Sequence, residues 1–267
     1  MDELEKIERI VLNNMRYYKV TKFENKSDKE GSVIGIFPSV TSVLGATSDK
    51  TFLKKWEKRI GKDQADYITQ SAGKRGTVMH RLCEIYLGLP MLMDKADRLE
   101  ETLRQSVNDR EINEYDNRAK MVGGMLFYNF IRSKTFDIIQ ETLITEKFLW
   151  TTRGGGYAGT VDNVSELFKF GTAVVDFKTS RKAKDPNQID DYKCQVGAYA
   201  VAVYDRLGYK PRSARILISN EVDTMPQDII LESVELKSYY NKFLERLAIF
   251  YNKFPPIHIG PVNTDLF

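Results

Sequence analysis

The sequence predicts a mixed α/β (α+β) fold, in which a central β-sheet is flanked by helices. Three observations predict it. Helical patterns come first, then a group of strands, then a helix and more strand, which is typical of a mixed sheet covered by helices. An all-helical section, residues 38–133, precedes the sheet. The 267 residues are 42% hydrophobic, which is enough apolar content for a sizeable core.

The N-terminal section, 1–37, combines one helix with strands. Residues 16–23 and 32–37 predict two strands separated by a polar turn, and Ser39 beside Pro38 predicts the start of the next helix. Residues 2–14 predict a short amphipathic helix, because apolar side chains recur at helical spacing: Leu4, Ile7, Ile10 and Val11.

The helical section, 38–133, is expected to be interrupted where glycine or proline occurs. Within it, residues 92–120 are highly charged and predict exposed helices or a mobile arch, whereas the apolar residues 121–132 predict a helix packed on the sheet. The expected interruptions are Gly61, Gly73 with Gly76, and Gly88 with Pro90.

The sheet core is predicted in residues 134–236, followed by a C-terminal helix and tail in 237–267, and we expect the whole chain, 1–267, to form a single domain. Gly154, Gly155 and Gly156 predict a flexible loop inside the core. Strands are predicted at 136–150, 157–166, 172–179, 213–219 and 227–236, and helices at 187–206 and 237–253.

Composition excludes several classes of protein. No apolar run approaches the roughly 18–20 residues that a membrane span requires, and the acidic start resembles neither a signal peptide nor a transit peptide. We therefore expect a cytoplasmic protein, in a prokaryotic cell or a phage-infected host, without a membrane partner. The two cysteines, Cys83 and Cys194, are too few for a disulfide scaffold, a zinc ribbon or an iron–sulfur cluster with four cysteine ligands.

Basic residues concentrate between Lys50 and Arg81, although the net charge is only +3. A solvated helix face is the simpler interpretation, and a nucleic-acid surface with Trp56 and Tyr67 stacking on bases is the functional one. The candidates for nucleic-acid binding in this stretch are Lys54, Lys55, Trp56, Lys58, Arg59, Lys74 and Arg75.

The most informative pattern is a hairpin that carries two acids. A turn centred near Lys169 places Asp162 and Asp176 at equal distances along two paired strands, so they stand opposite each other. Asp176 and Lys178 are two residues apart and therefore point to the same face. Opposed carboxylates favour a divalent cation with oxygen ligands, Mg²⁺ or Mn²⁺. Lys178 beside it can lower the pKa of a metal-bound water, orient that water, or stabilise charge on a phosphate. A buried salt bridge is the alternative.

These motifs together resemble the PD-(D/E)XK nucleases, and in particular their RecB-type branch. Gly-Thr-Val-Asp (159–162) and Val-Asp-Phe-Lys-Thr-Ser (175–180) resemble the core hairpin, Gly76 with His80 resembles the upstream Gly-x-x-x-His motif, and Gln195 with Tyr199 the downstream Gln-x-x-x-Tyr motif. Residues 38–44, with the helix rich in lysine and tryptophan that follows, resemble single-strand exonucleases of the mitochondrial genome maintenance type and their phage relatives.

The resemblance implies a restriction-endonuclease-like core with a helical insertion or arch before the hairpin. It implies one or two Mg²⁺ or Mn²⁺ ions and no iron–sulfur cluster. The implied ligands are His80, Asp162, Asp176 and the backbone carbonyl of Phe177, with Glu84 as a weaker candidate that could instead pair with Arg81 or Lys74. For Glu146 the resemblance implies a structural or site-lining role. The alternative is an exposed carboxylate on a strand.

The implied catalytic residues are Asp162, Asp176, Lys178, Gln195 and Tyr199, although Tyr199 could simply be a core tyrosine. Thr179, Ser180 and Arg181 follow the active strand and are expected to contact phosphates. The predicted function is a metal-dependent DNA exonuclease that digests single-stranded DNA from free ends. A nuclease fold that only binds DNA and a double-strand endonuclease of the same fold remain alternatives.

Overall fold

The computed structural model describes residues 4–25, 27–28 and 31–257. Within these residues, the principal sheet has five strands in the order β4-β5-β6-β7-β8. They are β4 (Ile139–Thr151), β5 (Tyr157–Leu167), β6 (Gly171–Ser180), β7 (Ser213–Asn220) and β8 (Gln227–Glu232). β6 and β7 are parallel and the other neighbours are antiparallel, so the sheet is mixed, as the sequence predicted.

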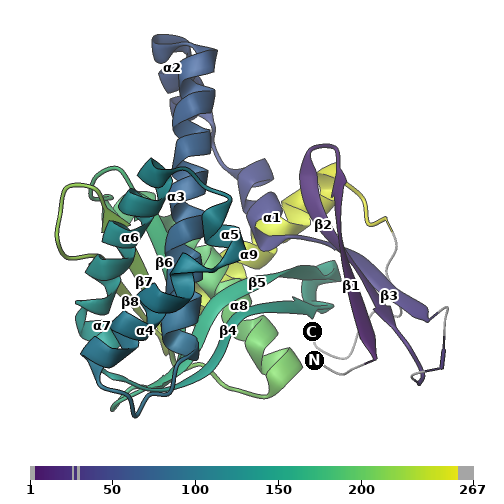
Figure 1. Ribbon diagram of the computed structural model, residues 1–267. Coiled ribbons are helices and arrows are strands. Elements are labelled where there is room, and N and C mark those ends of the chain that lie inside the picture. The colour runs from purple at the N-terminus through teal and green to yellow at the C-terminus, as the bar shows by residue number, and fades with distance from the viewer. Residues whose placement is uncertain (1–3, 26, 29–30, 258–267) are drawn as a thin grey trace.

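Helices cover both faces of this sheet (Figure 1). On one face, Val174, Ile216 and Ile218 pack against α1 (Val40–Thr47), α8 (Asp190–Leu207) and α9 (Ser233–Lys253). On the other face, Ala173, Val175, Phe177 and Leu217 pack against α3 (Lys62–Gly88) and α6 (Asn117–Ile131). Successive side chains of β6 therefore pack into two apolar layers, one on each face of the sheet.

The N-terminal segment differs from its prediction. Instead of a helix, it forms β1 (Glu5–Leu12), which pairs with β2 (Met15–Lys22), and β3 (Ser32–Pro38) lies on the other side of β2. The turn explains the difference: Asn13 and Asn14 both have positive φ, at 51° and 60°, which is the geometry of a tight hairpin. An eight-residue strand gains a full ladder there, whereas an isolated helix of that length is marginal.

The helical section is less interrupted than predicted. Gly61 separates α2 (Thr51–Ile60) from α3, and Gly88 ends α3, but Gly73 and Gly76 lie inside a continuous helix. A helical glycine costs only about 1 kcal/mol, which packing of α3 on the sheet offsets. α2 and the first turns of α3 project from the body of the molecule (Figure 1).

The charged segment between residues 92 and 120 forms α4 (Lys95–Val107), α5 (Arg110–Asn113) and the start of α6. It lies against α3: the Arg98 guanidinium stacks over Tyr86 at 4.2 Å and donates a 2.9 Å hydrogen bond to its carbonyl. Ile112 is also buried there. Apart from these anchors and a few others, the side chains of the segment are exposed or half-buried, so of the two predicted alternatives exposed helices describe it. The short helix α7 (Lys134–Asp137) leads from here into β4.

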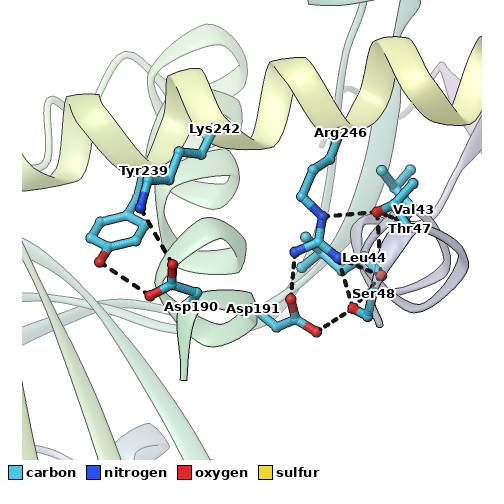
Figure 2. A network of polar contacts seen from close by, with 9 residues as sticks. All are labelled: Val43, Leu44, Thr47, Ser48, Asp190, Asp191, Tyr239, Lys242 and Arg246. Atoms are coloured by element: carbon cyan, nitrogen blue, oxygen red, sulfur yellow. Dashed lines mark hydrogen bonds and ion pairs between the residues drawn. The ribbon is translucent and has the colours of Figure 1, made fainter. Parts of the chain in front are cut away.

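One polar network fixes α1, α8 and α9 to each other (Figure 2). Arg246 of α9 pairs with Asp191 at the start of α8, and it donates to Thr47 Oγ1 at 2.8 Å and to the Leu44 carbonyl at the end of α1. Asp191 also accepts a 2.6 Å hydrogen bond from Ser48. α1 and α8 each carry residues of the site described below, so this network determines how the two helices lie around it.

Candidate functional site

The hairpin of β5 and β6 has the predicted register. Asn163 pairs with Val175 and Leu167 with Gly171, and Lys169 in the turn has a φ of +66°. Paired residues end at Asn163 and Val175, and the next position on each strand is an acid, Asp162 or Asp176. The two strands therefore present opposed carboxylates at the point where their ladder stops.

The two carboxylates have different environments. Asp162 Oδ2 accepts a 2.8 Å hydrogen bond from the Phe177 amide, so this side chain fills the gap between the strands. Asp176 is 1% exposed. Its Oδ2 lies 2.5 Å from Lys178 Nζ and its Oδ1 accepts a 3.2 Å hydrogen bond from Gln195. Both oxygens of Asp176 thus face the chain's own donors.

The neighbouring strand β4 adds a third acid. Thr145 pairs with Asn163 and Lys147 with Val161, so Glu146 stands opposite Asp162 on β4. Glu146 has a φ of +43°, a conformation that non-glycine residues adopt at a cost and that concentrates at functional sites. Register therefore aligns Glu146, Asp162 and Asp176 across three neighbouring strands. We call these three residues the acidic row.

His80 reaches this row from α3. Its Nδ1 lies 3.4 Å from Glu146 Oε1 and 3.7 Å from Asp162 Oδ2. Ligand atoms of His80, Glu146 and Asp162 all lie within 4.8 Å of one another. Imidazole with two carboxylates is a donor set that suits a divalent cation such as Mn²⁺, and carboxylates suit Mg²⁺. The residues present therefore fit a metal ion.

Burial and charge change the acidities in the site. Burial raises the pKa of Asp176 to about 6, assisted by the charge on Asp162 and opposed by Lys178. Burial alone would lower the pKa of Lys178, but Asp176 and Asp162 outweigh it and raise that pKa. For His80, burial is likewise outweighed by Asp162 and Glu146, so the imidazole pKa is raised.

His80, Glu146, Asp162 and Lys178, but not Asp176, line a pocket of about 650 Å³, which we call the central pocket. Among the predicted site residues, it is lined by His80, Glu84, Asp162, Phe177, Lys178, Thr179, Gln195 and Tyr199. Tyr199 lies directly on Gly159: a Cβ at residue 159 would come within 2.8 Å of the Tyr199 ring. The glycine of the Gly-Thr-Val-Asp motif is therefore required for this close approach.

Other predicted residues either have different partners or lie outside the central pocket. Glu84 lines the central pocket but pairs with Arg81 at 2.5 Å and is outside the group formed by His80, Glu146 and Asp162. Ser180 is buried and donates to the Lys182 carbonyl. The basic residues of α2, together with Trp56, line none of the described pockets. These α2 residues are Lys54, Lys55, Lys58 and Arg59.

Lys74, Arg75 and Arg181 lie on the other side of α3 and line a hollow of about 340 Å³ with Tyr67. Lys74 pairs with Asp116 at 3.5 Å and Arg75 with Glu221 at 3.0 Å, so two of these cations already have acidic partners. The structure therefore separates this part of the predicted nucleic-acid surface from the central pocket.

Glu146 lines the central pocket, as one of its predicted roles required. Its carboxylate also lies in the group that can hold a metal ion, a role that the sequence did not predict. A signal was present: extending the antiparallel register across the loop at Gly154–Gly156 places residue 146 opposite 162. The positive φ of Glu146 has no signal in the sequence.

A mixed sheet with an acidic row, a half-buried lysine and a helical histidine defines a class of metal-dependent phosphodiesterase sites. Residues 52–248 match the family model of the PD-(D/E)XK nuclease superfamily. That match covers more than half of the chain, so the protein belongs to the PD-(D/E)XK nuclease superfamily. Its members generally use divalent metal ions.

Solved structures give weaker similarities. A protein from Eubacterium rectale, provisionally named an exonuclease, is 12% identical with a TM-score of 0.41, and the match covers 67% of this chain and 65% of that one. The protein SSO0001 is 12% identical with a TM-score of 0.30, and the match covers 62% of this chain and 74% of that one. No curated protein matches. No helix among the described residues has the length and apolar character to cross a membrane.

Proposed function

We propose that this nuclease is a metal-dependent DNA exonuclease that hydrolyses phosphodiester bonds from the free ends of single-stranded DNA. The observation that carries the proposal is the convergence of His80, Glu146 and Asp162 within 4.8 Å in a pocket that Lys178 also lines, with Lys178 paired to Asp176. Preference for single strands and for ends rests on the resemblance of residues 38–44 to single-strand exonucleases.

Mg²⁺ or Mn²⁺ would be held by Asp162, Glu146 and His80, with Asp176 and the Phe177 carbonyl as further ligands. The N–H and C=O of one strand residue point toward the same neighbouring strand. Because the Phe177 amide points at Asp162, its carbonyl is directed to the same side. When bound, the metal ion supplies Lewis-acid polarisation of the phosphate and neutralises developing charge.

The chain's own residues hold and polarise the phosphate. The raised pKa keeps Lys178 protonated, so its role is to stabilise charge on phosphate oxygens rather than to accept a proton. Asp176 fixes the Lys178 ammonium, and Gln195 fixes Asp176. Thr179 lines the same pocket and would offer its hydroxyl for a phosphate contact.

Cleavage of end-labelled DNA tests the proposal. Linear single strands labelled at either end, a circular single strand and a duplex are incubated with Mg²⁺, with Mn²⁺ or with EDTA. We expect metal-dependent release of nucleotides from linear single strands, no cleavage of the circle, and loss of cleavage in D176A with DNA binding retained. Cutting of the circle would instead indicate an endonuclease, and DNA binding without any cleavage would indicate a binding module.

A further inference from the structure

Another pocket, which is lined by basic residues, adjoins the central pocket. It has a volume of about 550 Å³ and lies between the β1–β2 hairpin, α1 and the C-terminal end of α9. We call it the hairpin pocket. Figure 1 shows the β1–β2 turn beside the end of α9, with α1 to their left. Of its lining residues, Lys50 lies in the basic stretch predicted to guide nucleic acid, whereas Arg9, Arg16 and Lys253 were not predicted to bind it.

The hairpin pocket is lined by cations without acids. Its charged residues are Arg9, Arg16, Lys50 and Lys253, and no aspartate or glutamate lines it. All four are exposed. None of the four side chains forms an ion pair with a carboxylate of the described residues. In contrast, Lys74 and Arg75 beside α3 are already paired with Asp116 and Glu221. The hairpin pocket therefore has the unneutralised charge that a polyanion requires.

The two pockets share residues. Arg16 and Thr41 line both the central pocket and the hairpin pocket, so a bound chain can pass from one to the other along these side chains. Thr41 lies in the first turn of α1, whose N-terminal end carries a partial positive charge. Gly45 and Ala46 line the floor of the hairpin pocket, and a Cβ at Gly45 would meet no atom within 4 Å.

We propose that the hairpin pocket binds the phosphodiester backbone of the same single strand whose end occupies the central pocket. This inference rests on the proposed function and extends it. The strand runs from the acidic row past Arg16 and over α1 to Arg9, Lys50 and Lys253. It contacts the backbone rather than the bases, so binding there is independent of sequence.

Oligonucleotide length and salt test the proposal. Binding of 6-mer and 20-mer DNA to the wild-type protein and to R9Q/K50Q/K253Q is measured by fluorescence anisotropy, in EDTA so that no cleavage occurs. Losing three phosphate contacts lowers the salt slope of single-strand binding by about 2. We therefore expect the 20-mer affinity to fall at least about tenfold near 0.1 M salt, with a much smaller change for the 6-mer.

The control variant K134Q/K210Q/K237Q removes three exposed lysines that line none of the described pockets. It should keep the wild-type 20-mer affinity and salt slope. A second measurement is independent of mutation: 5-iododeoxyuridine placed at successive positions in the 20-mer should cross-link to peptides from residues 9–16 or 41–50. Circular dichroism melts verify that both triple variants are folded.

Equal loss of 20-mer affinity in the two triple variants, or wild-type behaviour of R9Q/K50Q/K253Q, would overturn the assignment. A lipid site would also overturn it. In that case the wild-type protein would bind anionic vesicles (phosphatidylserine in phosphatidylcholine) but not DNA, and R9Q/K50Q/K253Q would lose the vesicle binding. Because binding is measured without cleavage, a wild-type protein that binds the 20-mer through this pocket but cleaves nothing would refute the proposed function and leave the pocket assigned.

Discussion

The Phe177 amide donates a 2.8 Å hydrogen bond to Asp162 Oδ2, at the point where the ladder between β5 and β6 ends. A side chain thus takes the place of the next backbone acceptor. The carboxylate is fixed between two strands, and the same Oδ2 lies 3.7 Å from His80 Nδ1. This geometry gives Asp162 a fixed position before any metal ion binds.

Glu146 should contribute more to metal affinity than Glu84. In E146Q the group of His80, Glu146 and Asp162 loses one carboxylate, and we expect Mn²⁺ affinity to fall by about tenfold to a hundredfold. In E84Q the loss should be under about threefold, because Glu84 is occupied by Arg81. Isothermal titration with Mn²⁺ measures both. An E84Q defect as large as that of E146Q would restore Glu84 as a ligand.

Metal affinity should rise with pH through the titration of His80. Asp162 and Glu146 raise the imidazole pKa, so the protonated form is favoured without metal, and only neutral imidazole can bind the ion. Protons therefore compete with Mn²⁺ at low pH, and affinity increases as pH rises through that pKa. Titrations between about pH 5.5 and 8 should show this slope in the wild-type protein and a flatter one in H80N. An unchanged slope in H80N would exclude His80 as the titrating ligand.

Replacing Gly159 should disturb Tyr199. The added methyl in G159A would come within 2.8 Å of the Tyr199 ring, so we expect about 1–3 kcal/mol of destabilisation and reduced cleavage. G124A is the matched control, because a Cβ at Gly124 in α6 meets no atom within 4 Å and alanine favours a helix. Urea unfolding should place G124A at or slightly above the wild-type stability. A fully stable, fully active G159A would contradict the packing.

Arg246 should matter more for stability than Lys242 on the same helix. Its side chain is 18% exposed and binds α1 and α8, whereas Lys242 is 47% exposed and contacts a half-exposed Asp190 (Figure 2). We expect R246M to cost about 2 kcal/mol in urea unfolding and K242M less than about 0.5 kcal/mol. Equal effects would show that the network does not hold the three elements together.

Local patterns in the sequence were sufficient for the hairpin. Strand alternation placed Asp176 and Lys178 on one face, and the turn at Lys169 determined the register that aligns Asp162 with Asp176. Both follow from short-range geometry, a period of two residues and a tight turn. The same reasoning failed for β1, because four apolar residues at helical spacing also fit a strand when an Asn-Asn turn offers it a partner.

Only the tertiary structure decided what surrounds that hairpin. The position of His80 depends on which side of α3 packs against Val175 and Phe177, and the role of Glu146 depends on a third strand and a positive φ. Arg16, Lys50 and Lys253 come from three separate segments, and no local period relates them. Sequence fixes short-range geometry because neighbouring residues share one backbone. Convergence of distant segments depends on packing, which no local pattern encodes.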